Sequence, residues 1–346
     1  MEKLITVAVA AYNVEKYIAA MLESILAQTY QNMEILIVND GSTDGTRVIC
    51  EGFRDSRIRI IDQENGGLSK ARQRAVDEAQ GAYLCLVDGD DVLETGYVET
   101  LLRCIRETDA DIAVCEYREF TAQPGDGRYV ALPAAEETDI NREVISRRFL
   151  PMVSEFKLAD SWNKMYRTDF IRQTGVRFFV EKQYNGTDLA FNHLLAMHAP
   201  RYGVVHEALL NYRLTPGSRV RRKDKDLQGG FMQIISALLE EAQRLGYDEG
   251  MRRQLHMIYL DMLRRAAAER YRNTQGLVGF CRAWKTFHAR HRAFLREKFP
   301  GADTAGCSRG MRLFAALANR RCCLPMRLYL ALREREVARA MKEGTL

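Results

Sequence analysis

The amino-acid sequence predicts an α/β protein with a parallel sheet, followed by a helical region. Strand-like and helix-like segments alternate through the first 120 residues, a pattern that favours parallel strands with helices on both faces of the sheet. The strand-like segments are apolar along most of their length, as strands buried on both faces are. From Asp224 to about Met341, apolar residues recur at helical spacing instead.

Each element is justified by its own pattern. The first strand, LITVAVAAY, is rich in β-branched residues, and apolar side chains then recur at helical spacing to residue 29. The second strand ends in DGSTDGT, where Ser42, Thr43 and Asp44 can cap the next helix. We expect strands at 4–12, 33–40, 57–62, 81–88 and 111–117, helices at 14–29, 43–53, 68–80 and 95–107, a loop or hairpin at 120–140, and short helices and strands at 142–220.

Charge divides the chain into two parts. From Arg201 to the end there are 29 basic and 14 acidic residues, against 22 basic and 32 acidic before it. An acidic first part of the chain and a basic second part indicate that the two parts have different functions. We therefore expect a catalytic domain at 1–222 and a basic helical region at 223–346.

Other features bound the setting of the chain. The first residues lack the long apolar run of a signal peptide, and no stretch of 18 apolar residues predicts a spanning helix. The eight cysteines form no CxxC pair, and the adjacent Cys322 and Cys323 suit a mutual disulfide poorly. A reduced, cytoplasmic setting is the expectation.

Three carboxylates follow the strand at 81–88 within four positions: Asp88, Asp90 and Asp91. Asp91 with Glu94 could cap a helix, yet a cap does not need three acidic side chains. Like charges this close repel, and a hard divalent cation offsets the repulsion with oxygen ligands. The carboxyl ends of parallel strands are also where such sheets bind ligands. The pattern favours Mg²⁺ or Mn²⁺ bound together with phosphate oxygens.

Six ordered segments resemble the motifs of family 2 glycosyltransferases of the GT-A fold. They are VAVAAYN (7–13), VNDGSTDGT (38–46), NGGLSKARQRAV (65–76), DGDD (88–91, the DxD motif), SWNKMYR (161–167) and YRLTPGSRVR (212–221). One departure is Ala10, which stands where the family usually has proline. The resemblance implies an inverting, metal-dependent enzyme that takes a sugar from a nucleotide-diphosphate donor, UDP being the expected nucleotide.

The resemblance also implies roles for single residues at the donor site. Tyr12 would offer its ring to the base, Asp40 would accept the uracil imide N–H, and Gly66 would let the backbone approach the nucleotide. Asp90 would bind the metal directly, with Asp88 at the metal, the ribose or a bridging water. The remaining donor residues are Ala10, Asn13, Lys70, Arg72, Arg213 and Arg219, and Arg221 is a further basic candidate. Each residue also has a competing interpretation. Tyr12 could be a core tyrosine, Asp40 a helix cap and Gly66 part of a plain turn. Lys70 and Arg72 could be solvated surface charges.

The matching catalytic base is Asp188 in YNGTDLAFN, at the start of a predicted helix. The family's preceding glutamate is replaced by Thr187. The competing role for Asp188 is a helix N-cap. Trp162, Asn163 and Lys164 would line the sugar and acceptor cleft, with core burial the alternative for Trp162.

The basic tail at 308–342 mixes arginine with large apolar residues, which is typical of helices that lie on anionic membranes. Packing on the catalytic domain explains it equally well, whereas the aromatic residues are not spaced for nucleic-acid stacking. The expected acceptor is a glycan or a lipid-linked glycan at the inner face of the membrane. A nucleotide-sugar-binding protein with weak or no transferase activity is the alternative function. The glycine-rich loops of nucleotidyltransferases and NAD enzymes are absent.

Overall fold

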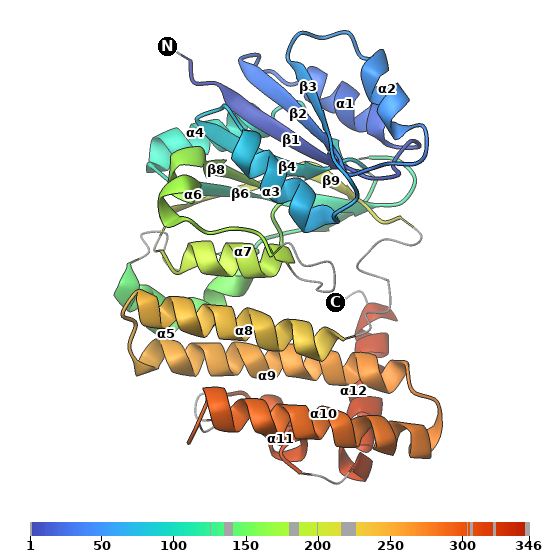
Figure 1. The fold of residues 1–346 in the computed structure, drawn as a ribbon, viewed down its shortest axis with the longest axis vertical. Helices are drawn as coiled ribbons and strands as arrows, with labels where there is room; N and C mark the ends of the chain where they lie inside the picture. Colours follow the sequence, from blue (N-terminus) through green and yellow to red (C-terminus); the bar gives the residue numbers. More distant parts are fainter. Residues whose placement is uncertain are drawn as a thin grey trace. The chain divides into compact units, whose positions relative to one another are not determined.

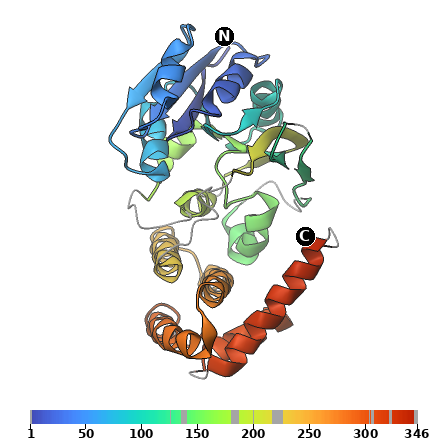
Figure 2. The same cartoon turned by 90° about the vertical axis from the view of Figure 1, so that its right-hand side faces the viewer.

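The computed structural model divides the chain into two compact units, Met1–Arg221 and Arg222–Leu346. The structure describes residues 2–124, 126–134, 141–179, 187–198, 200–215, 226–302, 304, 307–320 and 323–342. The first unit is built on one large sheet and the second is helical (Figures 1 and 2). The helical region predicted from residue 224 onward is confirmed.

In the described part of the first unit, the sheet has nine strands. Their bounds are β1 Ile5–Ala11, β2 Met33–Asn39, β3 Ile58–Asp62, β4 Tyr83–Asp88, β5 Val92–Leu93, β6 Ile112–Phe120, β7 Arg128–Val130, β8 Lys164–Arg167 and β9 Tyr202–Arg213. The order across the sheet is β3-β2-β1-β4-β8-β6-β9-β5, and β7 pairs with β6. The predicted strands are all present, and the antiparallel pairing of β7 with β6 confirms the hairpin, one of the two alternatives expected at 120–140.

The first four strands are parallel, as the alternating pattern predicts. β1 lies between β2 and β4, with Ala10 level with Val38 on one side and Asp88 on the other. Because the strands run the same way in register, their carboxyl ends meet at one edge of the sheet. That edge therefore gathers the residues that follow β1, β2 and β4.

The rest of the sheet is mixed, which the sequence did not indicate. β8 inserts between β4 and β6 and is antiparallel to both, while β9 pairs in parallel with β6. The short β5 is antiparallel to β9. The strand at 111–117 was expected to continue a parallel sheet. It instead lies one strand further out, because β8 separates it from β4, and β8 begins at Lys164, 44 residues after β6 ends at Phe120.

Helices cover both faces of this sheet. The helices of the unit are α1 Ile18–Leu26, α2 Thr46–Gly52, α3 Leu68–Glu78, α4 Tyr97–Thr108, α5 Arg142–Glu155, α6 Thr168–Thr174 and α7 Thr187–Ala196. Ile18, Met21 and Leu22 of α1 pack with alternate residues of β1, such as Val7 and Val9, in one apolar core that also includes α4. α3 covers the other face and crosses the strands in Figure 1.

The second unit consists of helices α8 Leu227–Arg244, α9 Glu249–Arg272, α10 Gly276–Lys298, α11 Arg309–Ala318 and α12 Cys323–Lys342. Asp226 and Asp248 cap α8 and α9 by accepting from backbone N–H groups three residues on. Phe280, Trp284 and Phe287 of α10 stack along the helix in the core. Among the described helices, none is long and apolar enough to cross a membrane.

A disulfide between Cys281 and Cys323 ties α10 to α12. The expectation of reduced cysteines does not hold at this position. Sequence reasoning weighed Cys323 only against its neighbour Cys322, whereas its partner lies 42 residues earlier. Helix packing brings the two together, and sequence spacing does not report that. Four other cysteines lie in apolar stretches of the sequence that predict core positions: Cys50, Cys85 and Cys115 are free and buried, whereas Cys104 is free and only partly buried.

Candidate donor and catalytic site at the carboxyl edge of the sheet

Asp40 follows β2 directly and organises the neighbouring loop. Its carboxylate, 2% exposed, accepts from the backbone N–H groups of Gly66 and Gly67 at 2.8 and 2.7 Å and from Gln63 Nε2 at 2.7 Å. Asp40 is therefore no helix cap, since Asp44 accepts from the first helical N–H of α2 instead. Three of the about four lone-pair sites of the carboxylate are occupied, so a further donor could meet only the last one.

The loop that Asp40 holds brings backbone close to the sheet edge. Gly67 precedes α3 with a φ of 88°, a conformation that glycine adopts without strain. A Cβ on Gly66 would lie 2.1 Å from Lys70 Cδ, so the loop and α3 approach too closely for a side chain there. Gly66 thus meets a steric requirement beyond that of a plain turn. Lys70 itself is exposed, on the first turn of α3.

Tyr12 leaves β1 and points to solvent, with 46% of the residue exposed. Its neighbour Asn13 has a φ of 54° and accepts from the Thr43 N–H at 2.8 Å through its side-chain oxygen. Ser42 Oγ in turn accepts from the Asn13 N–H. These contacts fix the segments after β1 and β2 to one another and exclude a core role for Tyr12. Its ring is available to a ligand.

The acidic turn after β4 is tightly built. Asp91 donates its backbone N–H to Asp88 O, and its wholly buried carboxylate accepts from the Arg213 N–H at 2.9 Å, which leaves Asp91 Oδ2 without a partner. Arg213 Nε donates to Asp90 O at 2.7 Å, and its guanidinium lies over the rings of Tyr17 and Phe120. Arg213 therefore lies beside Asp90, while Asp91 fixes the turn rather than capping a helix.

Two carboxylates of this turn, Asp90 and Asp91, have raised pKa values. Burial and the neighbouring Asp88 raise the pKa of Asp90 to about 6. Burial, together with Asp88 and Asp90, also raises the pKa of Asp91 well above its usual range. A cation would relieve the repulsion that keeps a proton on Asp90.

The turn fits a divalent cation of the kind that binds through few protein ligands. The Asp90 carboxylate accepts a hydrogen bond from its own backbone N–H, yet its pKa stays elevated, which marks it as a group that gains from a positive neighbour. Within the described ranges, no three acidic, histidine or cysteine side chains converge as a closed metal cage. Mg²⁺ and Mn²⁺ sites that also use substrate phosphates need only one or two carboxylates. The residues present therefore fit such a site.

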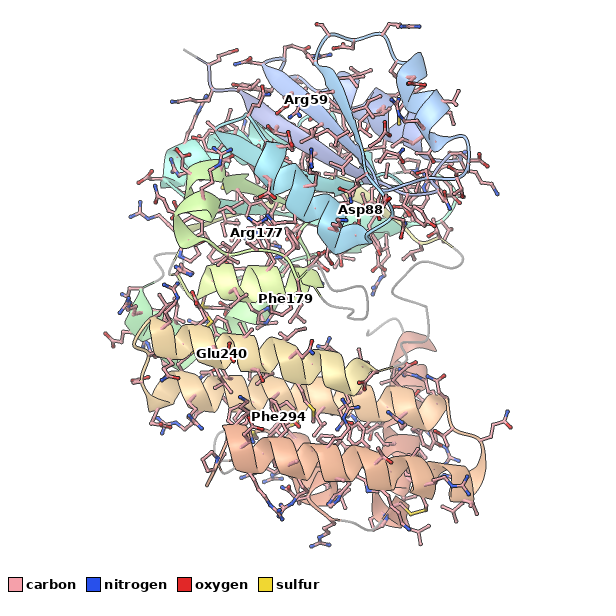
Figure 3. The ribbon with its side chains drawn as sticks, viewed as in Figure 1. Arg59, Asp88, Arg177, Phe179, Glu240 and Phe294 are labelled. Atoms are coloured by element: carbon pink, nitrogen blue, oxygen red, sulfur yellow. A yellow bond between two sulfur atoms is a disulfide. The ribbon has the colours of Figure 1, made fainter. Side chains whose placement is uncertain are left out.

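Arg72 connects this turn to Asp188. It is 1% exposed on α3, donates from Nη2 to Asp88 Oδ1 at 2.6 Å and from Nη1 to Asp188 Oδ2. Figure 3 labels Asp88 at the strand end beside α3. The interpretation of Arg72 as a solvated surface charge is wrong, because both ends of its guanidinium bind carboxylates in the interior.

Asp188 lies in the first turn of α7, which is held from several sides. Phe191 stacks on Phe178 at 3.9 Å, and Asn192 donates to Asp160 O at 3.1 Å and accepts from the Tyr166 hydroxyl. Burial raises the pKa of Asp188, and Arg72 acts in the opposite direction. Its Oδ1 is buried and has no partner in the described part of the protein. A carboxylate placed so can accept a proton from a group that enters the site.

Comparisons with known proteins agree with this geometry. The model of the family described as "Glycosyl transferase family 2" matches residues 6–180, just over half of the chain. The chain belongs to glycosyl transferase family 2. It is 35% identical to Glycosyltransferase GlyA of Streptococcus pneumoniae over 248 residues, 70% of this chain and 35% of that protein. To Glycosyltransferase GlyG of the same organism it is 29% identical over 257 residues, 72% of this chain and 83% of that protein.

Solved structures support the same fold. A crystal structure of Staphylococcus aureus TarS 1-349 in complex with UDP superposes with a TM-score of 0.69 at 20% identity and covers 96% of this chain and 91% of that one. The GT-A fold with a helical region behind it, expected from the motifs, is thereby confirmed. The family 2 match ends at residue 180, before Asp188.

Three residues expected to line the cleft of this family 2 enzyme lie in the core instead. Trp162 is 7% exposed and stacks on Tyr212 at 4.9 Å. Asn163 and Lys164 are wholly buried. Asn163 Nδ2 donates to Cys115 O, and Lys164 Nζ donates to the carbonyls of Lys157 and Asp160. Asn163 thereby holds the start of β8 against β6, and Lys164 holds the preceding turn against β8.

Three predicted site residues lie wholly or partly outside the described part of the chain: Arg219, Arg221 and the side chain of Thr187. Sequence reasoning missed Gln63, which helps Asp40 hold the loop, and Asp160, whose carboxyl lies 3.9 Å from Lys157 Nζ. Burial raises the pKa of Asp160, and the nearby Asp188 adds to that. Neither residue sits in a motif that signals its role, since each acts through a contact distant in sequence.

Proposed function

We propose that the unit Met1–Arg221 transfers a sugar from a UDP-sugar to a hydroxyl of a glycan or lipid-linked acceptor. The observation that carries the proposal is the meeting of the Asp88–Asp91 turn with Asp188 through Arg72 at the carboxyl edge of the sheet. The UDP complex of TarS, which shares the fold, supports UDP as the nucleotide. Family membership supports sugar transfer as the reaction.

The donor would lie along the strand ends. Tyr12 would stack on the uracil with its exposed ring, and Asp40 would accept the imide N–H through its remaining lone pair. Ala10, Asn13 and Gly66 would shape the backbone around the nucleotide. Lys70 and Arg213, and Arg219 beyond the described residues, would supply positive charge for the diphosphate.

Asp90, with Asp88 beside it, would hold Mn²⁺ or Mg²⁺. The cation supplies Lewis-acid neutralisation of the leaving diphosphate. Arg213 stands next to Asp90 and acts on the same negative charge. Asp91 keeps the turn in shape by accepting the Arg213 N–H.

Asp188 would act as the general base. Its carboxylate takes the proton of the acceptor hydroxyl while the acceptor oxygen bonds to the anomeric carbon. The bond from that carbon to the diphosphate oxygen breaks, and UDP leaves with the electron pair. A single displacement inverts the anomeric configuration. Thr187 in place of glutamate removes a second negative charge beside the base, which favours the ionised form of Asp188.

The second unit would contact an anionic membrane surface. On α12 the residues Leu324, Leu328 and Leu332, spaced four apart, are 57, 62 and 50% exposed. Met326 and Leu330 of the same helix are buried, so the helix faces its own unit with one side and solvent with the other. Exposed arginines accompany this stripe: Arg309, Arg312, Arg320 and Arg333. This proposal extends to a cytoplasmic, peripheral location, with acceptors at the inner face of the membrane.

Vesicle sedimentation tests this contact. The full chain should sediment with vesicles that contain phosphatidylglycerol, and Leu328→Glu should reduce the bound fraction several-fold without a change in melting temperature. The matched control is Val48→Glu, because Val48 is 71% exposed on α2 and belongs to the first unit, outside the helix that carries the stripe. Equal binding by wild type and Leu328→Glu would contradict the proposed surface.

The transfer reaction is tested with UDP-glucose, UDP-galactose and UDP-N-acetylglucosamine in the presence of Mn²⁺. A bound donor should raise the melting temperature, since ligand at about 100 times its Kd adds about 2.7 kcal/mol to stability. UDP release from that donor, slow with water and faster with a competent acceptor, is the expected result. Donor binding without any UDP release would favour a nucleotide-sugar-binding protein instead.

A further inference from the structure

Arg72 occupies an unusual position for a basic residue of a donor site. It lies in the middle of α3, on the side that carries the buried Ala71, Ala75 and Val76, and only 1% of it is exposed. A lone buried guanidinium is costly, so its place depends on the two carboxylates that it binds. Asp88 comes from the end of β4 and Asp188 from α7, 100 residues apart in the sequence.

We infer that Arg72 is a positioning residue that aligns the base Asp188 with the donor-binding turn, and not a ligand of the diphosphate. Its two terminal nitrogens donate to different carboxylates, one on each side. A planar guanidinium fixes the direction of both partners at once, which a lysine ammonium cannot do. Asp188 Oδ2 is thereby engaged, and Oδ1 is the oxygen left for the acceptor proton. This inference rests on the proposed role of Asp188.

The surroundings of Asp188 explain why a base here needs such a partner. Four charged side chains face it from the described elements: Arg72 on α3, Asp88 at the end of β4, Asp160 before β8, and Lys164 on β8. Burial and Asp88 raise the pKa of Asp188, while Arg72 and, less strongly, Lys164 lower it. Without the guanidinium, burial would favour the protonated carboxyl, which cannot accept a proton.

The test compares Arg72→Gln with wild type in UDP release from the UDP-sugar that stabilises the chain most. Release should fall about 10²-fold, within the range that a positioned base supplies. UDP affinity with Mn²⁺, measured by calorimetry, should stay within about threefold because the diphosphate contacts lie elsewhere. The acid limb of the rate–pH profile should move to higher pH. Arg74→Gln is the matched control: Arg74 lies on the same helix, 48% exposed and paired with Glu78, and its loss should change neither rate nor profile.

A double variant decides between positioning and an independent role. If Arg72 acts through Asp188, then Arg72→Gln with Asp188→Asn should release UDP as slowly as Asp188→Asn alone. Losses that multiply, or a UDP affinity that falls as much as the rate, would overturn the inference and leave the base in place. A wild-type rate in Asp188→Asn would instead overturn the base itself, so the two failures are distinguishable. Melting curves of each variant show that the fold is intact.

Discussion

The two units treat charge in opposite ways. Among the described residues of the first unit, seven charged side chains are buried: Glu34, Asp40, Arg72, Asp91, Glu116, Glu155 and Lys164. In the second unit, over the described residues, the buried polar side chains are Gln228, His256 and His291, and its many arginines pair at the surface, as Arg244 does with Glu241. The second unit is filled with aromatic rings, Trp284 and Tyr259 among them.

This difference indicates that the first unit carries the reaction, whereas the second unit has a structural role. Buried charges cost stability unless they are paired, so a protein that keeps many of them in one unit uses them to hold loops or to act on ligands. In the first unit, Asp40, Asp91 and Arg72 lie at the carboxyl ends of β2 and β4, whereas Glu34 binds Arg59 at the amino end of β2 and Glu116 on β6 accepts from the Leu132 N–H. The comparison predicts that substitutions of buried charged residues strongly change function or folding in the first unit. It also predicts that pH changes the stability of the second unit through the buried His291.

The largest expected effect among binding variants comes from Asp90→Ala. It should remove the gain in UDP affinity that Mn²⁺ gives, a loss of about 10²-fold or about 2.7 kcal/mol. The reason is that Asp88 binds Arg72 and Asp91 binds the Arg213 N–H, whereas burial and Asp88 raise the pKa of Asp90, so Asp90 is the carboxylate that gains most from a cation. Calorimetry of UDP with and without Mn²⁺ measures it. Asp77→Ala, on the exposed side of α3, is the control. An unchanged Mn²⁺ effect in Asp90→Ala would exclude the metal role.

Lys164→Met tests a buried charge that serves the fold. Loss of the ammonium leaves the carbonyls of Lys157 and Asp160 and the Asn163 oxygen without their donor, which should cost about 2–3 kcal/mol of unfolding free energy. UDP affinity should stay within about twofold of wild type. Urea denaturation and calorimetry measure the two quantities, with the exposed Lys3→Met as the control. A stable Lys164→Met variant that binds UDP poorly would instead support the prediction that Lys164 lines the cleft.

The second unit should lose stability in acid through His291. Burial lowers the pKa of His291 to about 3, against an ordinary value near 6.5. Between these values the unfolded chain binds a proton that the folded chain does not, so stability falls as pH decreases from about 6.5 to about 3, by about 3 kcal/mol at pH 4. In His291→Leu the loss of melting temperature between pH 7 and pH 4 should be smaller. A pH dependence identical to that of wild type would show that His291 does not titrate on unfolding.

Much of this architecture could be predicted from the sequence. The parallel core, the strand-end position of Asp40 and Asp88, and the helical region all follow from local patterns. The insertion of β8 and the disulfide of Cys281 with Cys323 could not be predicted, because each depends on pairing between distant segments. The predicted position of Lys164 in the cleft was wrong for the same reason, because Lys164 begins the inserted strand β8. The burial of Arg72 did have a signal: it shares a helix with Ala71, Ala75 and Val76, which mark the inward side of α3.

The central claim, that Asp188 acts as the general base and the buried Arg72 positions it, is tested most directly by Asp188→Asn. The asparagine keeps the size and hydrogen-bonding reach of the side chain and removes its basicity. UDP release from the bound donor should fall by about 10²- to 10⁴-fold, the usual contribution of a positioned base. UDP affinity with Mn²⁺ should remain that of wild type, because the uracil and metal contacts lie at other strand ends. Release at the wild-type rate would contradict the account and leave Asp188 as the first turn of a helix and nothing more.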